Sequence, residues 1–214
     1  GEKSVRKASF WSENLGKQVI NSTLSLHDNG LLEGGMSSGS RDVEGVPRQH
    51  RALVEDGRLC NMLWSTRDAA QQVAEGRIEA AASTGSASSG GHQAPPSTGC
   101  TELFLTSTEA PRSMEALLAH MGDGYVVNSV MGAHTANPSS GDFSVTSSSI
   151  LKVENGEIIG SLKQAGLSGN LAKALNGAVH LGANVRRQGS YSSGSMHLPP
   201  TRPSRKLRCI CDCI

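Results

Sequence analysis

Histidine spacing is the first test for a hydrolytic zinc site in this chain. Such a site needs two imidazoles about one helical turn apart and a nearby carboxylate that activates water. Neither His-Glu-x-x-His nor His-Glu-x-x-x-His occurs, and no histidine has another within four positions. The seven histidines are His27, His50, His92, His120, His134, His180 and His197. We therefore predict no catalytic residue and no metal ligand, with His120 at the cationic end of a helix and His180 as a surface or capping residue.

Cysteine is the second residue type with metal or redox chemistry. The five cysteines are Cys60, Cys100, Cys209, Cys211 and Cys213. Their odd number argues against a disulfide framework and favours a reducing, cytoplasmic setting. Alternate residues of a strand share one face, so the last three thiols would form a row and would not close a tetrahedron. We expect a last strand or an irregular tail there, with a soft-metal site as the alternative.

A polar loop between two apolar stretches offers a further kind of site. Residues 127–144 run from an apolar strand into a polar loop and out again, and binding sites are often built where strands end. The candidates for a peptide-binding or interface surface are His134, Thr135, Asn137, Asp142, Ser168 and Asn170. The alternative is that Asn137-Pro138 and Gly141-Asp142 simply make turns.

Other classes of function have no support in the sequence. Neither a Gly-x-Ser-x-Gly elbow nor a phosphate-binding Walker loop is present. The formal charge is +1, from 20 basic and 19 acidic side chains. This balance does not indicate the excess of positive charge that binding to nucleic acid or an anionic membrane requires. No apolar run approaches the roughly 20 residues that span a bilayer. We predict neither a nucleic-acid partner nor a membrane partner.

Hairpins are the clearest structural signals. Residues 52–59 place Asp56-Gly57 between apolar flanks, and residues 150–159 do the same with Asn155-Gly156. Both central residues of a type I′ turn need positive φ, which Asn, Asp and Gly tolerate best. A third, weaker hairpin is predicted over 24–32, around Asp28-Asn29-Gly30.

The remaining elements complete an α+β fold made mainly of antiparallel β-sheet, with hairpins and a few short helices. Further strands are expected over 102–106 and 124–130. Helices are expected over 66–75, 113–121 and 171–175 because caps and Gly stops flank them. Residues 83–99 are too rich in Gly, Ser and Pro to pack as an element and predict a long loop. We expect one domain over 1–200 and a basic, Cys-rich tail or last strand over 201–214.

Several of these segments, taken in order, resemble the C-terminal domain of the TldD/PmbA family. The resemblance runs over nearly the whole chain, and the ordered set is far more specific than any one segment. The matching segments are 6–10, 15–19, 42–49, 53–59, 83–87, 134–138, 140–144, 153–158, 168–171 and 193–200. Ser193 stands where the family has a Cys that is a metal ligand in TldD-type chains, and a hydroxyl is a poor replacement for a thiolate on zinc.

The resemblance implies a PmbA (TldE)-like subunit domain of a cytoplasmic metallopeptidase system that acts on unfolded peptides in proteolysis or peptide maturation. In that family a TldD-type subunit carries the zinc motif, and a PmbA-type subunit lacks it. We therefore expect a TldD-like partner in a heterodimer, zinc in that partner and no cofactor in this chain. Family members also have an N-terminal α/β domain, which this sequence does not contain.

Two other hypotheses stay open at this point. One is a truncated TldD-type zinc peptidase whose histidine pair lies upstream of residue 1. The other is a peptide-binding or metal-binding module that uses the cysteines near the C-terminus.

Overall fold

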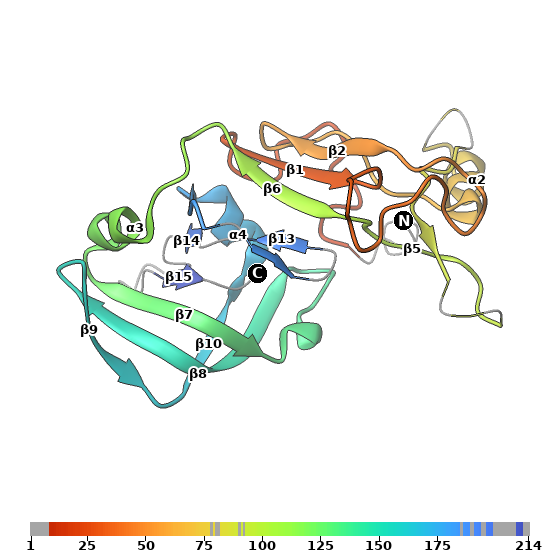
Figure 1. Cartoon of the computed structure of the whole chain (residues 1–214). Coiled ribbons are helices and arrows are strands. Elements are labelled where there is room, and N and C mark those ends of the chain that lie inside the picture. The colour runs from red at the N-terminus through yellow and green to blue at the C-terminus, as the bar shows by residue number, and fades with distance from the viewer. Residues whose placement is uncertain are drawn as a thin grey trace.

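The computed structural model contains two main β-sheets, one two-stranded sheet and a few short helices (Figure 1). The structure describes residues 9–77, 79, 82–89, 91, 93–184, 186–188, 191–193, 196–198 and 209–211, with the backbone alone from 186 onward. The prediction of an α+β fold dominated by antiparallel sheet is confirmed. Among the strand pairs of the described residues, β13 with β6 and β15 with β7 are parallel.

The first sheet has six strands in the order β12-β13-β6-β1-β2-β3. Its strands are β1 (Leu24–Asn29), β2 (His50–Glu55), β3 (Arg58–Leu59), β6 (Leu103–Ser107), β12 (Arg186–Gln188) and β13 (Tyr191–Ser193). Its core contains Val19, Ile20, Leu24, Val54, Leu59 and Val179. Val179 comes from the later half of the chain, so this core joins segments that are far apart in the sequence.

The second sheet has seven strands, and one long hairpin dominates it. Its strands are β7 (Gly124–Met131), β8 (Asp142–Glu154), β9 (Glu157–Leu162), β10 (Ala165–Asn170), β11 (His180–Leu181), β14 (Met196–Leu198) and β15 (Cys209–Cys211). The order is β10-β8-β7-β15-β14-β11, and β9 also pairs with β8. Glu157–Leu162 pairs with the last part of β8, and Ala165–Asn170 pairs with its first part. Thus β9 and β10 follow one another along the same side of β8 and together form an edge of the sheet.

The two strongest hairpin predictions are confirmed by their turn geometry. Asp56 and Gly57 have φ of 47° and 76°, and Asn155 and Gly156 have φ of 52° and 81°. These positive values at both central positions are what a type I′ turn requires. The chain therefore reverses between β2 and β3 and between β8 and β9.

The third predicted hairpin, over 24–32, is wrong. Both sides of β1 are occupied by other strands, β2 and β6. Gly30 has no positive φ and instead donates its backbone N–H to Gln49 O at 3.0 Å. Asp28 is buried, and its Oδ1 accepts from the backbone N–H groups of Thr101 and Glu102 at 2.7 and 2.9 Å. The aspartate therefore ties β1 to the start of β6 and does not form a turn.

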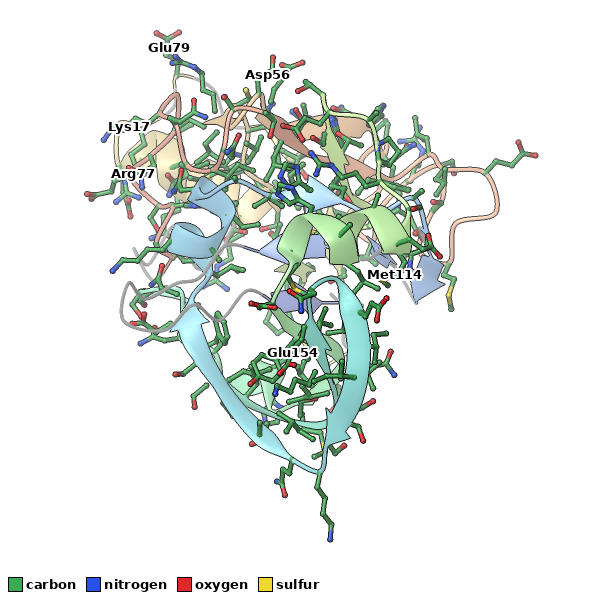
Figure 2. The ribbon with its side chains drawn as sticks, turned by 90° about the vertical axis from the view of Figure 1, so that its left-hand side faces the viewer. Lys17, Asp56, Arg77, Glu79, Met114 and Glu154 are labelled. Atoms are coloured by element: carbon green, nitrogen blue, oxygen red, sulfur yellow. The ribbon has the colours of Figure 1, made fainter. Side chains whose placement is uncertain are left out.

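The three predicted α-helices are confirmed, with caps where the sequence places them. They are α2 (Thr66–Ala74), α3 (Met114–Met121) and α4 (Leu171–Asn176), and a 3₁₀ turn, η1, covers Ala133–Thr135. Ser113 accepts from Ala116 N–H at the start of α3. Figure 2 shows Met114 in α3 and Glu154 beneath that helix, near the β8–β9 turn. Leu117, Leu118 and Met121 of α3 pack on Val126 and Val153.

The segment 83–99 contains more structure than expected. Its ends pair as β4 (Ala87–Ser88) and β5 (Ser97–Thr98). Thr84 Oγ1 accepts from Trp64 N–H at 2.8 Å, and Gly85 adopts φ of 69° against the backbone of Pro47. The segment is therefore anchored at both ends. The predicted basic tail at 201–208 lies outside the described residues.

Among the helices of the described residues, none has the length and apolar character needed to cross a membrane. The longest α-helix in the part of the chain that the structure describes, α2, has 9 residues. A bilayer-spanning helix needs roughly twice that length.

Candidate functional site

A polar cluster lies at the end of the β9–β10 edge, where η1, the start of β8 and the start of α4 meet. Asn137 organises its turn. Asn137 N–H donates to Asp142 O at 2.8 Å, and Gly141 N–H donates to Asn137 O at 2.8 Å. The Asn137 Oδ1 atom also accepts from Ser139 N–H at 2.9 Å. The polar stretch thus closes into a compact turn immediately before β8.

Asp142 and Asn170 join the two strands at this point. They are opposed in the β8–β10 register, and Asn170 Nδ2 donates to Asp142 Oδ1 at 2.8 Å. The same amide donates to Ser140 O at 2.8 Å, while its Oδ1 accepts from Lys173 N–H and caps α4. Ser140 Oγ donates to Asp142 Oδ2 at 2.6 Å. One amide therefore holds a strand end, a turn and a helix start together.

This hydrogen bonding sets the charge of the cluster. The bond from Asn170, followed by the bond from Ser140, holds the pKa of Asp142 below its ordinary value of 3.8. Both donors stabilise the carboxylate over the carboxylic acid. Asp142 is exposed and stays ionised at neutral pH, so the cluster presents a fixed negative charge to solvent.

The six predicted site residues lie in three different places. The structure brings Asn137, Asp142 and Asn170 into one hydrogen-bonded network. His134 and Thr135 are exposed on the adjacent η1 turn, where Thr135 Oγ1 donates to Gly132 O. Ser168 lies two positions before Asn170 in β10. It pairs there with a serine of β8.

Two residues that contact this polar cluster were not predicted from the sequence. Ser140 belongs to a segment that was noted, but its role as a donor to Asp142 depends on the fold of the turn. Phe10 is far away in the sequence, yet its N–H donates to Pro138 O at 3.0 Å. A Cβ atom on Gly141 would lie 3.5 Å from the Phe10 ring, so the aromatic side chain packs directly on this turn.

The cluster combines an ionised carboxylate, amide groups and hydroxyls at the end of a sheet edge. Within the part of the chain that the structure describes, no group of three or more His, Cys, Asp or Glu side chains could hold a metal ion. Hydrogen bonding to an extended chain is what this arrangement can offer.

Other segments that carry the family resemblance have structural roles. Asp42 Oδ1 accepts from Glu44 N–H and Val46 N–H, both at 2.9 Å. Its Oδ2 accepts from Ala87 N–H at 3.0 Å, which ties the 42–49 turn to β4.

The comparisons with known proteins agree with this architecture. The family described as the PmbA/TldA metallopeptidase C-terminal domain matches residues 1–202. The chain therefore belongs to the TldD/PmbA family.

Three relatives illustrate the extent of the match. An uncharacterised protein of Methanocaldococcus jannaschii is 31% identical over 196 residues, which cover 91% of this chain and 43% of that protein. Metalloprotease PmbA of Escherichia coli O157:H7 is 28% identical over 199 residues, 93% of this chain and 40% of the relative. The Metalloprotease PmbA homolog of Haemophilus influenzae is 30% identical over 198 residues, which cover 92% of this chain and 40% of that relative. The chain thus spans about two fifths of the length of these relatives.

Solved structures show the same fold. A Thermotoga maritima protein described as a candidate modulator of a DNA gyrase has a TM-score of 0.75 at 30% identity, covering 90% of this chain and 41% of the other. TldE from Thermococcus kodakarensis has a TM-score of 0.69 at 21% identity, and the match covers 98% of this chain and 42% of TldE.

Proposed function

We propose that this chain is the C-terminal domain of a PmbA/TldE-type subunit, without a catalytic centre of its own. It would act beside a zinc-bearing TldD-type subunit in a cytoplasmic peptidase system for proteolysis or peptide maturation. The family match and the likeness to PmbA relatives support this assignment. The observation that carries the role of this domain is the edge formed by β9 and β10.

The edge has the properties of a surface for an extended peptide. An edge strand exposes a row of main-chain N–H and C=O groups that can pair with a further strand. All six residues of β9 are exposed, and Ile158 and Ile159 have exposures of 49% and 51%. Main-chain pairing gives affinity with little dependence on sequence. That mode of recognition suits unfolded peptides of varied sequence.

The polar cluster would then receive one end of the bound peptide. Asp142 and Asn170 lie at the last residue pair of the β8–β10 ladder. A peptide added along β10 would end beside them, with His134 and Thr135 on the neighbouring turn. Side chains of this kind can fix register where the ladder stops. Ser168, two positions earlier, would flank the peptide within the strand.

Peptide binding tests the role of the edge. An unstructured fluorescent peptide should bind the chain, and the same peptide with alternate backbone amides N-methylated should bind about tenfold more weakly or not at all, because the methyl groups remove the ladder donors. Equal affinity for the two peptides would refute strand addition.

A pair of matched variants locates the binding surface. Ile159→Lys places a charge on the edge and should weaken binding several-fold, since edge lysines oppose strand pairing. Val43→Lys is the control, because Val43 is 52% exposed and lies in a loop of the first sheet's half of the molecule. Equal effects of the two substitutions would place the peptide elsewhere.

The subunit assignment needs a separate experiment. The full-length parent protein should co-purify with a TldD-type protein from the same cell, and peptide hydrolysis should require both proteins. Zinc-dependent hydrolysis by the purified chain alone would overturn the non-catalytic assignment. It would favour instead a catalytic chain.

A further inference from the structure

Glu102 is a fully buried carboxylate with few hydrogen-bond donors around it. It immediately precedes β6 and is 0% exposed. Its Oε1 accepts from Ser37 N–H at 3.0 Å. No group in the described part of the chain is hydrogen-bonded to Glu102 Oε2, although this atom is shielded from solvent. An ionised carboxylate in such surroundings is costly unless a positive charge or further donors compensate it.

Asp28 is a neighbouring buried carboxylate, and it is better compensated. Its Oδ1 accepts from two backbone N–H groups, those of Thr101 and Glu102. The charge of Arg48 also favours the ionised form of Asp28, and Arg48 donates to Thr101 Oγ1 at 2.9 Å. Burial is nevertheless the strongest influence, and it raises the pKa of Asp28 above 3.8. Negative charge is therefore poorly solvated in this region, and Glu102 has fewer donors than Asp28.

Ser38 brings a second unpartnered oxygen to the same place. Its Oγ atom is buried and has no hydrogen-bond partner among the described residues. A Cβ atom on Gly35 would overlap Ser38 Oγ and would lie 3.0 Å from Glu102 Oε1. The hydroxyl and the carboxylate therefore converge beside the Gly35 backbone, where the lack of a side chain leaves them room.

Two kinds of small group can satisfy buried oxygens of this sort, namely water and metal ions. Water can bond to both oxygens, but it leaves the charge of the Glu102 carboxylate uncompensated. A cation bonds to the same lone pairs and also compensates the charge, so the arrangement favours a cation.

The loop that carries Gly35 and Ser38 gives access to these oxygens. Gly39 N–H donates to Gly30 O at 3.0 Å and closes the loop at its base. An open hollow of about 400 Å³ lies on the loop, and Gly35, Ser38 and Gly39 are among the residues that line it. The hollow therefore leads from solvent toward the position of Glu102.

We propose that this loop and Glu102 bind a hard metal cation of the Na⁺, K⁺ or Ca²⁺ class. Glu102 supplies the charged ligand and Ser38 a hydroxyl, and backbone carbonyl groups of the loop and water complete the coordination. Oxygen ligands of these kinds are the ones that hard cations prefer. The ion holds the 30–39 loop against the start of β6. The site contains a single carboxylate, and we expect a dissociation constant of about 10⁻⁴–10⁻³ M, as in other weak sites.

This site is separate from the β9–β10 edge and does not depend on the proposed peptidase role. We assign the ion a structural function and no part in hydrolysis.

Thermal unfolding of the full chain tests the proposal. The melting temperature is measured in tetramethylammonium chloride, whose cation is too large for the site, and in NaCl, KCl and CaCl₂ at equal ionic strength. An ion that binds only the folded state raises the melting temperature as its concentration increases. At about a hundred times the dissociation constant, the rise should be about 5–10 °C for a chain of this size. The salt that produces this rise identifies the ion.

Three variants locate the ion. Glu102→Gln keeps the shape of the side chain but removes its charge, and it should abolish the ion-dependent rise. Glu33→Gln is the matched control, because Glu33 is exposed in the same loop, and it should leave the rise unchanged. Ser38→Ala should need about tenfold more ion for half of the rise. In tetramethylammonium chloride Ser38→Ala should be at least as stable as the wild type, since it removes an unpartnered buried hydroxyl.

Several results would overturn the proposal. The same melting temperature in all four salts would show that no ion binds. A rise that persists in Glu102→Gln, or that is lost equally in Glu33→Gln, would place the ion elsewhere. If Glu102→Gln fails to fold, Ser38→Ala still decides the question, and an ion dependence equal to that of the wild type would then refute the site.

Discussion

Gly85 occupies a position where alanine would meet two separate penalties. Its φ is 69°, in the left-handed region. A Cβ atom there would lie 2.2 Å from Pro47 O and 2.9 Å from Pro47 C, both in the backbone. Gly76 has nearly the same φ, 67°, but no described atom lies within 4 Å of its Cβ position. Alanine at Gly76 therefore meets only the conformational penalty, whereas alanine at Gly85 meets both the conformational and the steric penalty.

The magnitudes follow from these contacts. An alanine in the left-handed region costs about 1–2 kcal/mol, and this penalty applies at both positions. At Gly85 the turn must also move by about 1 Å to relieve the overlap, and forcing extra atoms into a packed site costs about 1–3 kcal/mol more. We expect Gly76→Ala to lower the free energy of unfolding by about 1–2 kcal/mol and Gly85→Ala by about 2–5 kcal/mol.

Urea unfolding followed by circular dichroism measures both variants against the wild type. Gly85→Ala should have the lower midpoint, with an m-value equal to that of Gly76→Ala, because the same surface is exposed on unfolding. If the two free energies agree within about 0.5 kcal/mol, the steric argument is refuted. The packing of Gly85 against Pro47 would then not be a stabilising constraint.

Three further perturbations test individual contacts. Asn170→Ala should return the pKa of Asp142 toward 3.8 in an NMR titration. Because the native pKa is depressed, the stability from this contact is present above pH 3.8 and lost as pH falls through the native pKa; an unchanged pKa would contradict this cause. Ser113→Ala removes the 3.2 Å hydrogen bond from Ala116 N–H and should lower the free energy of unfolding by about 1 kcal/mol, measured by thermal unfolding. An unchanged melting temperature would show that this helix cap does not contribute to stability. Leu117→Ala, at a side chain that is 0% exposed, should cost about 3 kcal/mol by urea unfolding, and a loss under about 1 kcal/mol would mean that the α3 core collapses around the change.

Local chemistry made much of the fold predictable. Asp56-Gly57 and Asn155-Gly156 are suited to positive φ at both turn positions, and the chain reverses at both. The helices were found because their caps are local as well, as Ser113 of α3 illustrates. The same kind of signal failed at Asp28-Asn29-Gly30. There the carboxylate of Asp28 binds backbone N–H groups of a distant segment, and no local pattern reveals that use.

The candidate site was predictable only in part. Asn137 and Asp142 were chosen for their polar side chains in a loop at a strand end, and Asn170 comes from a segment that resembles the family. The fold joins the three residues. The packing of Phe10 on this turn depends on a contact between segments more than a hundred residues apart in the sequence. The two histidines that were given structural roles had different outcomes. His120 lies in the last turn of α3, as predicted. The prediction of a surface or capping role for His180 is wrong, because His180 is buried, with 9% exposed. Its Nδ1 lies 2.7 Å from Glu109 Oε2, and this contact joins segments 71 positions apart, so no local pattern reveals it.

The path of the chain between the two main sheets has a mechanical consequence. After the chain has formed most of the second sheet, it contributes Val179 to the core of the first sheet. It then adds β11 to the second sheet, β12 and β13 to the first sheet, and finally β14 and β15 to the second sheet. A protease cut in the connection between β6 and α3 would therefore leave two fragments that remain interlocked. We expect the nicked protein to migrate as one species under native conditions and to melt in a single transition.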